Sequence, residues 1–173
     1  MFNGGWKMVA GVRVVVYARA RSATAVVYVR TLAGVRPVSV RLSRRKAEKL
    51  KMGARSVKSF EGGWSGRLST VAAAKLILGS EAIRSRADPK WLDRIVRAAY
   101  RRDAQIRAAV WRAALGKVGG DRDLARAYLG AWLRARNREV PGGDADADLV
   151  SQQYYKLVWR LGDRYVVQVA PWE

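Results

Sequence analysis

The chain has 173 residues, of which 50% are apolar, and its 34 Lys and Arg against 14 Asp and Glu give a formal net charge of +20. It has neither histidine nor cysteine, which excludes disulfides, thiol chemistry, the commonest zinc ligands and the commonest general base. We therefore expect no enzyme and no bound metal or cofactor. We expect a polyanionic partner that supplies counter-charge.

The first third of the chain is the most basic part and also the richest in β-branched residues. Its segments 12–21, 24–31 and 37–42 are separated by turn-forming residues, which predicts three strands of an antiparallel sheet. Alternation would turn valines to one face and basic and aromatic residues to the other. The second face would carry Arg13, Tyr17, Arg19, Arg21, Tyr28, Arg30 and Arg41.

This second face is a candidate nucleic-acid interface, because arginine binds phosphates and base edges while tyrosine stacks on bases. It contains no acidic residue, whereas an ordinary solvated face usually mixes both signs. Two alternatives remain open. The face could be the solvated side of a one-sided sheet, or residues 1–42 could extend as a basic arm around a partner.

Residues 43–53 predict a short basic helix, with Ser43 as its N-cap and Gly53 at its end. Its first turn adds three candidate nucleic-acid-binding residues: Arg44, Arg45 and Lys46. The Gly- and Ser-rich segment 54–67 is expected to be a linker. The domain organisation would then be a basic β-rich region over 1–53, the linker over 54–67, and a helical domain with a C-terminal strand over 68–173.

Helical patterns dominate the rest of the chain. Asp88 and Pro89 are typical of the N-cap and first position of the longest of these helices. A final β-branched segment predicts a closing strand that could add to the N-terminal sheet. The helices are expected over 69–78, 88–115, 121–138 and 148–161, and the strand over 164–169.

The long helix over 88–115 carries a stripe of arginines within roughly a sixth of its circumference. Compensating acids are scarce, since only Asp93 and Asp103 stand four residues before an arginine on this helix. The stripe is a second candidate for phosphate binding, with a solvated helix face as the alternative. It consists of Arg94, Arg97, Arg101 and Arg112.

Two other motifs carry less weight. Asp144, Asp146 and Asp148 have the opening spacing of a calcium loop, but the glycine and the bidentate glutamate of that loop are missing. Residues 69–87 have a weak helix-turn-helix pattern, whose second helix is cut short at Asp88. Neither motif changes the expectation that phosphates are bound by side chains.

Together these patterns predict an α+β protein: a basic N-terminal three-stranded antiparallel sheet, or an extended arm, followed by an α-helical bundle with one long Arg-striped helix. The expected function is coating or packaging of nucleic acid, double-stranded DNA in preference to RNA, as in a nucleocapsid, coat or chromatin-like protein. Charge spread over several elements and the scarcity of Asn and Gln favour packaging over base reading. Self-association into an oligomer or filament would accompany it.

The same patterns leave two other functions open and bear on the location of the protein. A site-specific regulator or recombination accessory factor would show a preferred sequence, and a ribosomal-type protein would bind RNA. No apolar run approaches the ~18 residues of a membrane-spanning helix, and no secretory signal pattern is visible. An intracellular, nucleoid-associated or virion location is therefore expected, and the Arg-rich, Cys-free composition is compatible with a thermophilic source.

Overall fold

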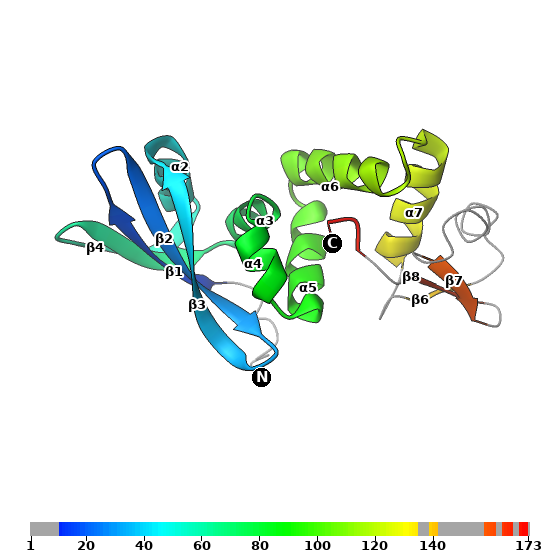
Figure 1. Cartoon of the computed structure of the whole chain (residues 1–173), viewed down its shortest axis with the longest axis horizontal. Helices are drawn as coiled ribbons and strands as arrows, with labels where there is room; N and C mark the ends of the chain where they lie inside the picture. The colour runs from blue at the N-terminus through cyan, green and yellow to red at the C-terminus, as the bar shows by residue number, and fades with distance from the viewer. Residues whose placement is uncertain (1–10, 135–138, 142–157, 162–163, 168–169, 173) are drawn as a thin grey trace. The chain divides into compact units, whose positions relative to one another are not determined.

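A computed structural model describes residues 11–134, 139–141, 158–161, 164–167 and 170–172 (Figure 1). The chain divides into two compact units, Met1–Ile106 and Arg107–Glu173. The first unit holds a five-stranded sheet with helices packed on one face, and the second holds helices and a small three-stranded sheet.

The large sheet is antiparallel throughout, in the order β3-β2-β1-β5-β4. β1 (Val12–Ala18), β2 (Ser22–Thr31) and β3 (Gly34–Ser43) are the strands expected near the N-terminus. β4 (Ala54–Phe60) pairs with β5 (Gly63–Leu68), and β5 pairs with β1. The expectation of a three-stranded sheet followed by a helical bundle is therefore wrong, because five strands and the helices packed on them form one α+β unit.

The segment 54–67, expected as a linker, forms β4 and most of β5 because its glycines serve strand pairing rather than flexibility. A Cβ at Gly63 would overlap the carbonyl oxygen of Val16 on β1, so only glycine lets β5 lie this close. Trp64 and Leu68 are buried at alternate positions of β5, which is the two-residue period of a strand.

Alternation divides the sheet into a buried and an exposed face, as the sequence predicts. The buried face is built from small and β-branched side chains; Val14 and Val27 are opposite one another on β1 and β2, and Val38 continues the row on β3. These three side chains are almost completely buried. The hydrophobic effect of covering this face holds the sheet against the helices.

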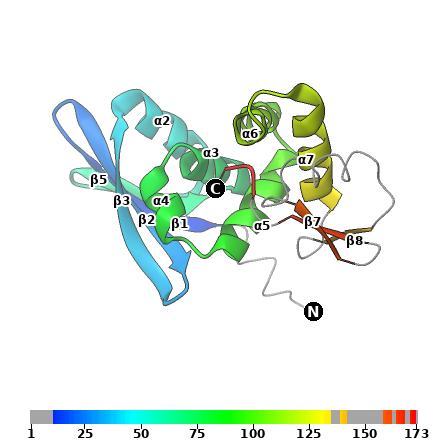
Figure 2. The ribbon, with the colours of Figure 1, turned by 45° about the vertical axis from the view of Figure 1, so that its right-hand side comes forward.

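Three helices make the main contacts with the sheet, and a fourth packs chiefly on one of them (Figure 2). α2 (Arg44–Met52) contacts β2, β3 and β4, α3 (Thr70–Leu78) contacts β5, and α4 (Glu81–Arg86) contacts β2 and β3. α5 (Pro89–Tyr100) packs on α3. The helices expected over 43–53 and 69–78 are thus confirmed. Each of the four helices begins at a side chain that accepts a backbone hydrogen bond: Ser43, Ser69, Ser80 and Asp88.

The single long helix expected over 88–115 is two helices. α5 ends at its C-cap Arg101, and α6 (Ala104–Lys117) begins three residues later. The Asp103 carboxylate accepts a hydrogen bond from the Ile106 N–H at 3.0 Å and caps α6. This bond also holds the pKa of Asp103 below its usual range. The helical period alone does not reveal the break, because the capping aspartate also fits a polar position of a continuous helix.

The second unit contains most of α6, then α7 (Arg122–Arg134) and a three-stranded antiparallel sheet in the order β6-β8-β7. α7 lies within the helix expected over 121–138. The helix expected over 148–161 is wrong over its last four residues, which form a strand, and 148–157 lie outside the described residues. The closing strand pairs within this small sheet rather than with the N-terminal one. The strands are β6 (Glu139–Pro141), β7 (Val158–Leu161) and β8 (Arg164–Val167).

Candidate nucleic-acid interface

The exposed face of the five-stranded sheet is basic on every strand. The five strands contain no Asp or Glu. The acids nearest in sequence are Glu48, on α2, and Glu61, in the turn between β4 and β5. The register places on this face Arg13 of β1, Arg30 of β2, Arg41 of β3, Arg55 and Lys58 of β4, and Arg67 of β5.

Three of these arginines stand side by side across three neighbouring strands. Arg13 of β1 is opposite Arg67 of β5, and Arg67 is opposite Arg55 of β4. Neighbouring strands lie about 4.8 Å apart, so the three side chains emerge from about 10 Å of sheet. We call Arg13, Arg67 and Arg55 the arginine row.

The contacts of the arginine row are with neutral groups. Arg67 donates a hydrogen bond to the Gly11 carbonyl at 3.2 Å, and the Arg13 guanidinium lies 4.7 Å from the centroid of the Tyr28 ring. None of the ion pairs found in the described ranges includes a row residue. Like charges directly opposite each other destabilise a sheet. The row therefore costs stability, and no acidic side chain in the described ranges pairs with it.

Replacing Arg55 with threonine is expected to stabilise the protein by about 0.5 kcal/mol at low salt, because it removes one repulsive cross-strand pair and adds a good strand former. Urea unfolding at low and at high salt measures the effect. The gain should shrink at high salt, which screens exposed charges. An equal gain under both conditions would attribute the effect to strand propensity and not to repulsion.

One end of the arginine row borders a groove of about 340 Å³. Its lining includes Arg13, Arg67, Arg30 and Tyr28, and no acidic side chain. Three of the sequence-predicted residues, Arg13, Tyr28 and Arg30, are thus brought together here. An anionic oxygen that enters this groove can approach several guanidinium groups at once, which gives short, charge-assisted hydrogen bonds.

The other end of the exposed face holds Tyr17 and Arg41. Tyr17 packs edge-on against Phe60 of β4, with ring centroids 5.9 Å apart. Arg19 and Arg21, predicted to lie on the same face, are instead in the turn between β1 and β2, because β1 ends at residue 18. The Arg19 guanidinium still reaches to 6.0 Å from the centroid of the Tyr17 ring.

The three candidates on α2 lie in its first turn and not on the exposed face of the sheet. Arg44 donates a hydrogen bond to the Arg19 carbonyl at 2.8 Å, which ties α2 to the turn between β1 and β2. Arg45 is exposed, and Lys46 lines a second pocket. The structure therefore separates Arg44, Arg45 and Lys46 from the arginine row.

The predicted stripe is divided between two helices. Arg94 lies on α5 and Arg101 caps its C-terminus, whereas Arg112 lies on α6 in the second unit. Arg97 is half-buried and pairs with Asp93 at 3.1 Å, one helical turn away. The four arginines therefore do not share one continuous helix, and the charge of Arg97 is already matched.

The sequence prediction missed three basic residues of this face, Arg55, Lys58 and Arg67. All three fall in the segment 54–67, expected to be a linker. The signal that reveals Arg67 is the alternation within β5, in which Trp64 and Leu68 turn to the buried face and Arg67 to the exposed one. Only the pairing of β5 with both β1 and β4 shows that the three arginines are neighbours.

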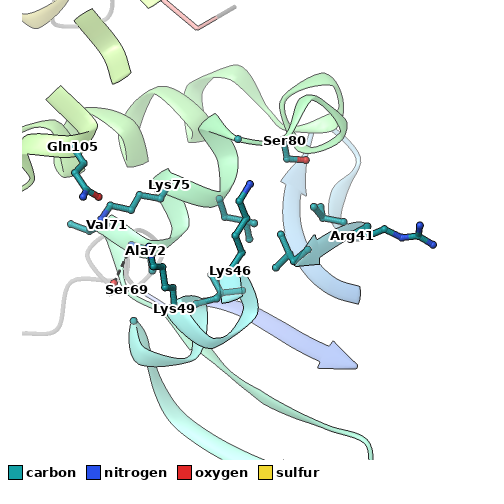
Figure 3. Close-up of a pocket in the computed structure, with 15 residues that line it drawn as sticks. Arg41, Lys46, Lys49, Ser69, Val71, Ala72, Lys75, Ser80 and Gln105 are labelled. Carbon is teal, nitrogen blue, oxygen red and sulfur yellow. Dashed lines mark hydrogen bonds between the residues drawn. The ribbon is translucent and has the colours of Figure 1, made fainter. Parts of the chain in front are cut away.

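A second basic site lies among the helices of the first unit, in a pocket of about 460 Å³ (Figure 3). Lys46 and Lys49 of α2 and Lys75 of α3 line it. Much of its polar lining is engaged elsewhere, because Lys75 pairs with Asp103 at 3.6 Å and the Ser69 hydroxyl caps α3. Lys46 and Lys49 have no ion pair in the described ranges. The exposed sheet face is the stronger candidate because its cations stand in register on all five strands.

Comparison of the chain with protein-family models, with curated proteins and with solved structures finds no match. Within the described ranges, every helix is too short or too polar to cross a membrane. The same ranges contain no cluster of acidic side chains that could hold a metal ion; Asp144, Asp146 and Asp148 lie outside them. A function can therefore be inferred only from the geometry of the exposed face.

Proposed function

We propose that the protein binds nucleic acid, double-stranded DNA in preference to RNA, through phosphate contacts made by the exposed face of its five-stranded sheet. The observation that carries this proposal is the arginine row, in which three adjacent arginines have no acidic partner in the described part of the chain. A polyanion supplies the missing charge. Repulsion between neighbouring guanidinium groups is then outweighed by their attraction to phosphates.

The charge density of the row suits a duplex. Duplex DNA carries one negative charge per about 1.7 Å of its axis, both strands counted, so a duplex length of ~10 Å, the span of the row, carries about six phosphates in all and presents some of them to the three arginines. Arg30, Arg41 and Lys58 extend the basic surface to either side on the same face. The duplex can therefore lie across several strands at once.

The composition of the face favours coating over recognition of one sequence. The strands contain no Asn or Gln, the residues that read adenine, and no acid to read cytosine. Cations on all five strands bind the phosphate backbone of any sequence. The role that follows is packaging of double-stranded DNA, with copies of the chain placed side by side along it.

The protein is expected to bind a random duplex with a log–log salt slope of at least about 2.7 in magnitude, because each of the three arginines of the row neutralises one phosphate at about 0.9 each. Fluorescence anisotropy of a labelled duplex, titrated over a range of salt concentrations, measures the slope. A slope near zero, or no binding at low salt, would contradict the proposal.

Competition experiments distinguish the alternative functions. Unlabelled duplexes of unrelated sequence should compete equally for a packaging protein. A footprint at one preferred sequence would indicate a site-specific regulator or recombination factor instead. Tighter binding to an RNA hairpin than to duplex DNA would indicate a ribosomal-type protein.

A further inference from the structure

The hairpin between β2 and β3 extends past its neighbour in the sheet (Figure 2). Pairing of β2 with β3 continues to Thr31 and Gly34, whereas the last pair of β1 with β2 is Val14 with Val27. The end of the hairpin is therefore a two-stranded ribbon. Its tip consists of Leu32 and Ala33.

One strand of this ribbon is fixed to the first unit almost as far as the tip. Val29 is fully buried, and the Arg30 carbonyl accepts a hydrogen bond from the Asp88 N–H, the N-cap of α5, at 2.8 Å. These contacts hold one strand of the ribbon against the helical layer. The turn beyond Arg30 therefore projects in a defined direction, because the strand that leads into it cannot swing.

The turn at the tip is closed by its own hydrogen bonds. The Thr31 hydroxyl donates to the Gly34 carbonyl at 2.7 Å and accepts from the Ala33 N–H at 3.1 Å. Gly34 has φ +100°, which other residues rarely adopt. The turn therefore presents Leu32 outward in one conformation.

Leu32 is exposed to solvent and has basic residues near it on both strands of the ribbon. Its side chain is 86% exposed, although a single exposed leucine elsewhere on a surface needs no explanation. Here it stands at the tip of a rigid ribbon between Arg30 and Arg36, with no acid on either strand. It lies four residues beyond Tyr28 along β2, about 13 Å from the end of the arginine row.

We propose that Leu32 inserts between adjacent base pairs of a duplex held on the arginine row, entering from the minor groove and kinking the DNA. Apolar side chains act as such wedges when a basic surface holds the flanking phosphates. Arg30 and Arg36 are placed to contact the backbone on either side of the insertion. This inference rests on the proposed function and adds bending of DNA to it.

Only the Leu32 side chain is small enough to enter the minor groove. The groove is about 6 Å wide, which is narrower than a ribbon whose strand axes alone lie about 4.8 Å apart, so the ribbon stays outside and its tip residue acts as the wedge. Insertion should favour pyrimidine–purine steps, which unstack most readily. The ribbon therefore gives the protein a preference for flexible steps without hydrogen-bond reading of bases.

The test uses the full chain with two duplexes. One duplex carries donor and acceptor dyes at its ends and reports bending by energy transfer, and the other carries 2-aminopurine at a single TA step and reports unstacking by a rise in fluorescence. Wild-type protein should bend the first by about 20–90° and brighten the second. Leu32→Ser should lose both signals while its affinity falls only a few-fold, because its phosphate contacts remain.

Met52→Ser is the matched control, since Met52 is also 86% exposed but lies at the end of α2. This variant should bend and unstack DNA as the wild type does. A wild-type complex with straight, fully stacked DNA, or a Leu32→Ser variant that bends as well as the wild type, would overturn the wedge and leave phosphate binding intact. Absence of any wild-type binding would overturn both proposals.

Discussion

Replacing Arg13, Arg55 and Arg67 together with glutamine is expected to weaken binding to a random duplex about 500-fold at about 0.1 M salt. Each phosphate contact contributes about eightfold at that salt concentration, and the three contributions multiply. Glutamine keeps a polar side chain at each position but removes the charge. Anisotropy titrations of this variant, which we call the row variant, give the affinity directly.

Arg94, Arg101 and Arg102 provide the matched control for the row variant. All three are exposed and belong to the first unit, but they lie on α5 or just after it. Changing them to glutamine, to give the helix variant, removes the same net charge. We expect a much smaller loss of affinity, because distant charges are screened at this salt concentration. Equal losses in the two variants would mean that binding depends on net charge and not on the arginine row.

Replacing Gly63 with alanine is expected to destabilise the protein by about 3 kcal/mol. The added Cβ would overlap the carbonyl oxygen of Val16 and also press on the Phe60 ring. Since one contact is with backbone, β1 and β5 must move apart. Their separation disturbs the pairing of Arg13 with Arg67, so the variant should also bind duplex less tightly. Urea unfolding followed by circular dichroism measures the stability.

Gly62→Ala is the control for this change, because it adds the same atom one residue earlier. No atom lies within 4 Å of a Cβ at Gly62, so its cost comes only from its φ of +93°. We expect a loss of about 1 kcal/mol there. Equal losses at the two positions would show that the contact with Val16 is relieved without moving the strands.

Local signals in the sequence predict much of the first unit correctly. Serine and aspartate caps mark where its helices begin, because a side-chain oxygen that satisfies a free N–H is a local feature. Ser43, Ser69 and Asp88 all occupy the expected cap positions. The alternation in β1 to β3 likewise depends only on neighbours along the chain, and it assigns their faces correctly.

Features that depend on partners distant in sequence were not predictable in the same way. In the sequence alone, Gly63 is typical of a linker. Its close approach to β1 shows that it belongs to a strand. The break at Asp103 is a different case: its hydrogen bond to Ile106 is local, but a polar residue at this position also fits a continuous helix. β8 pairs with β6 and β7 and not with the N-terminal sheet. The two-residue period of a strand does not indicate which other strand it pairs with.

The residues of the candidate site form the same two groups: some follow from the pattern within one strand, and others depend on the order of the strands. Arg13, Tyr28 and Arg30 follow from alternation within single strands, and the structure brings them to one groove. Arg55 and Arg67 join them only through the strand order β1-β5-β4. The arginine row is a product of register across three strands, so no single segment of the sequence displays it.

The most direct measurement is the log–log salt slope of the row variant beside those of the helix variant and the wild type, on the same random duplex. We expect the slope of the row variant to be smaller in magnitude by about 2.7, as three lost phosphate contacts require, and the slope of the helix variant to equal that of the wild type. Equal slopes for the row variant and the wild type would show that the arginine row does not contact phosphates, and would contradict the proposed interface.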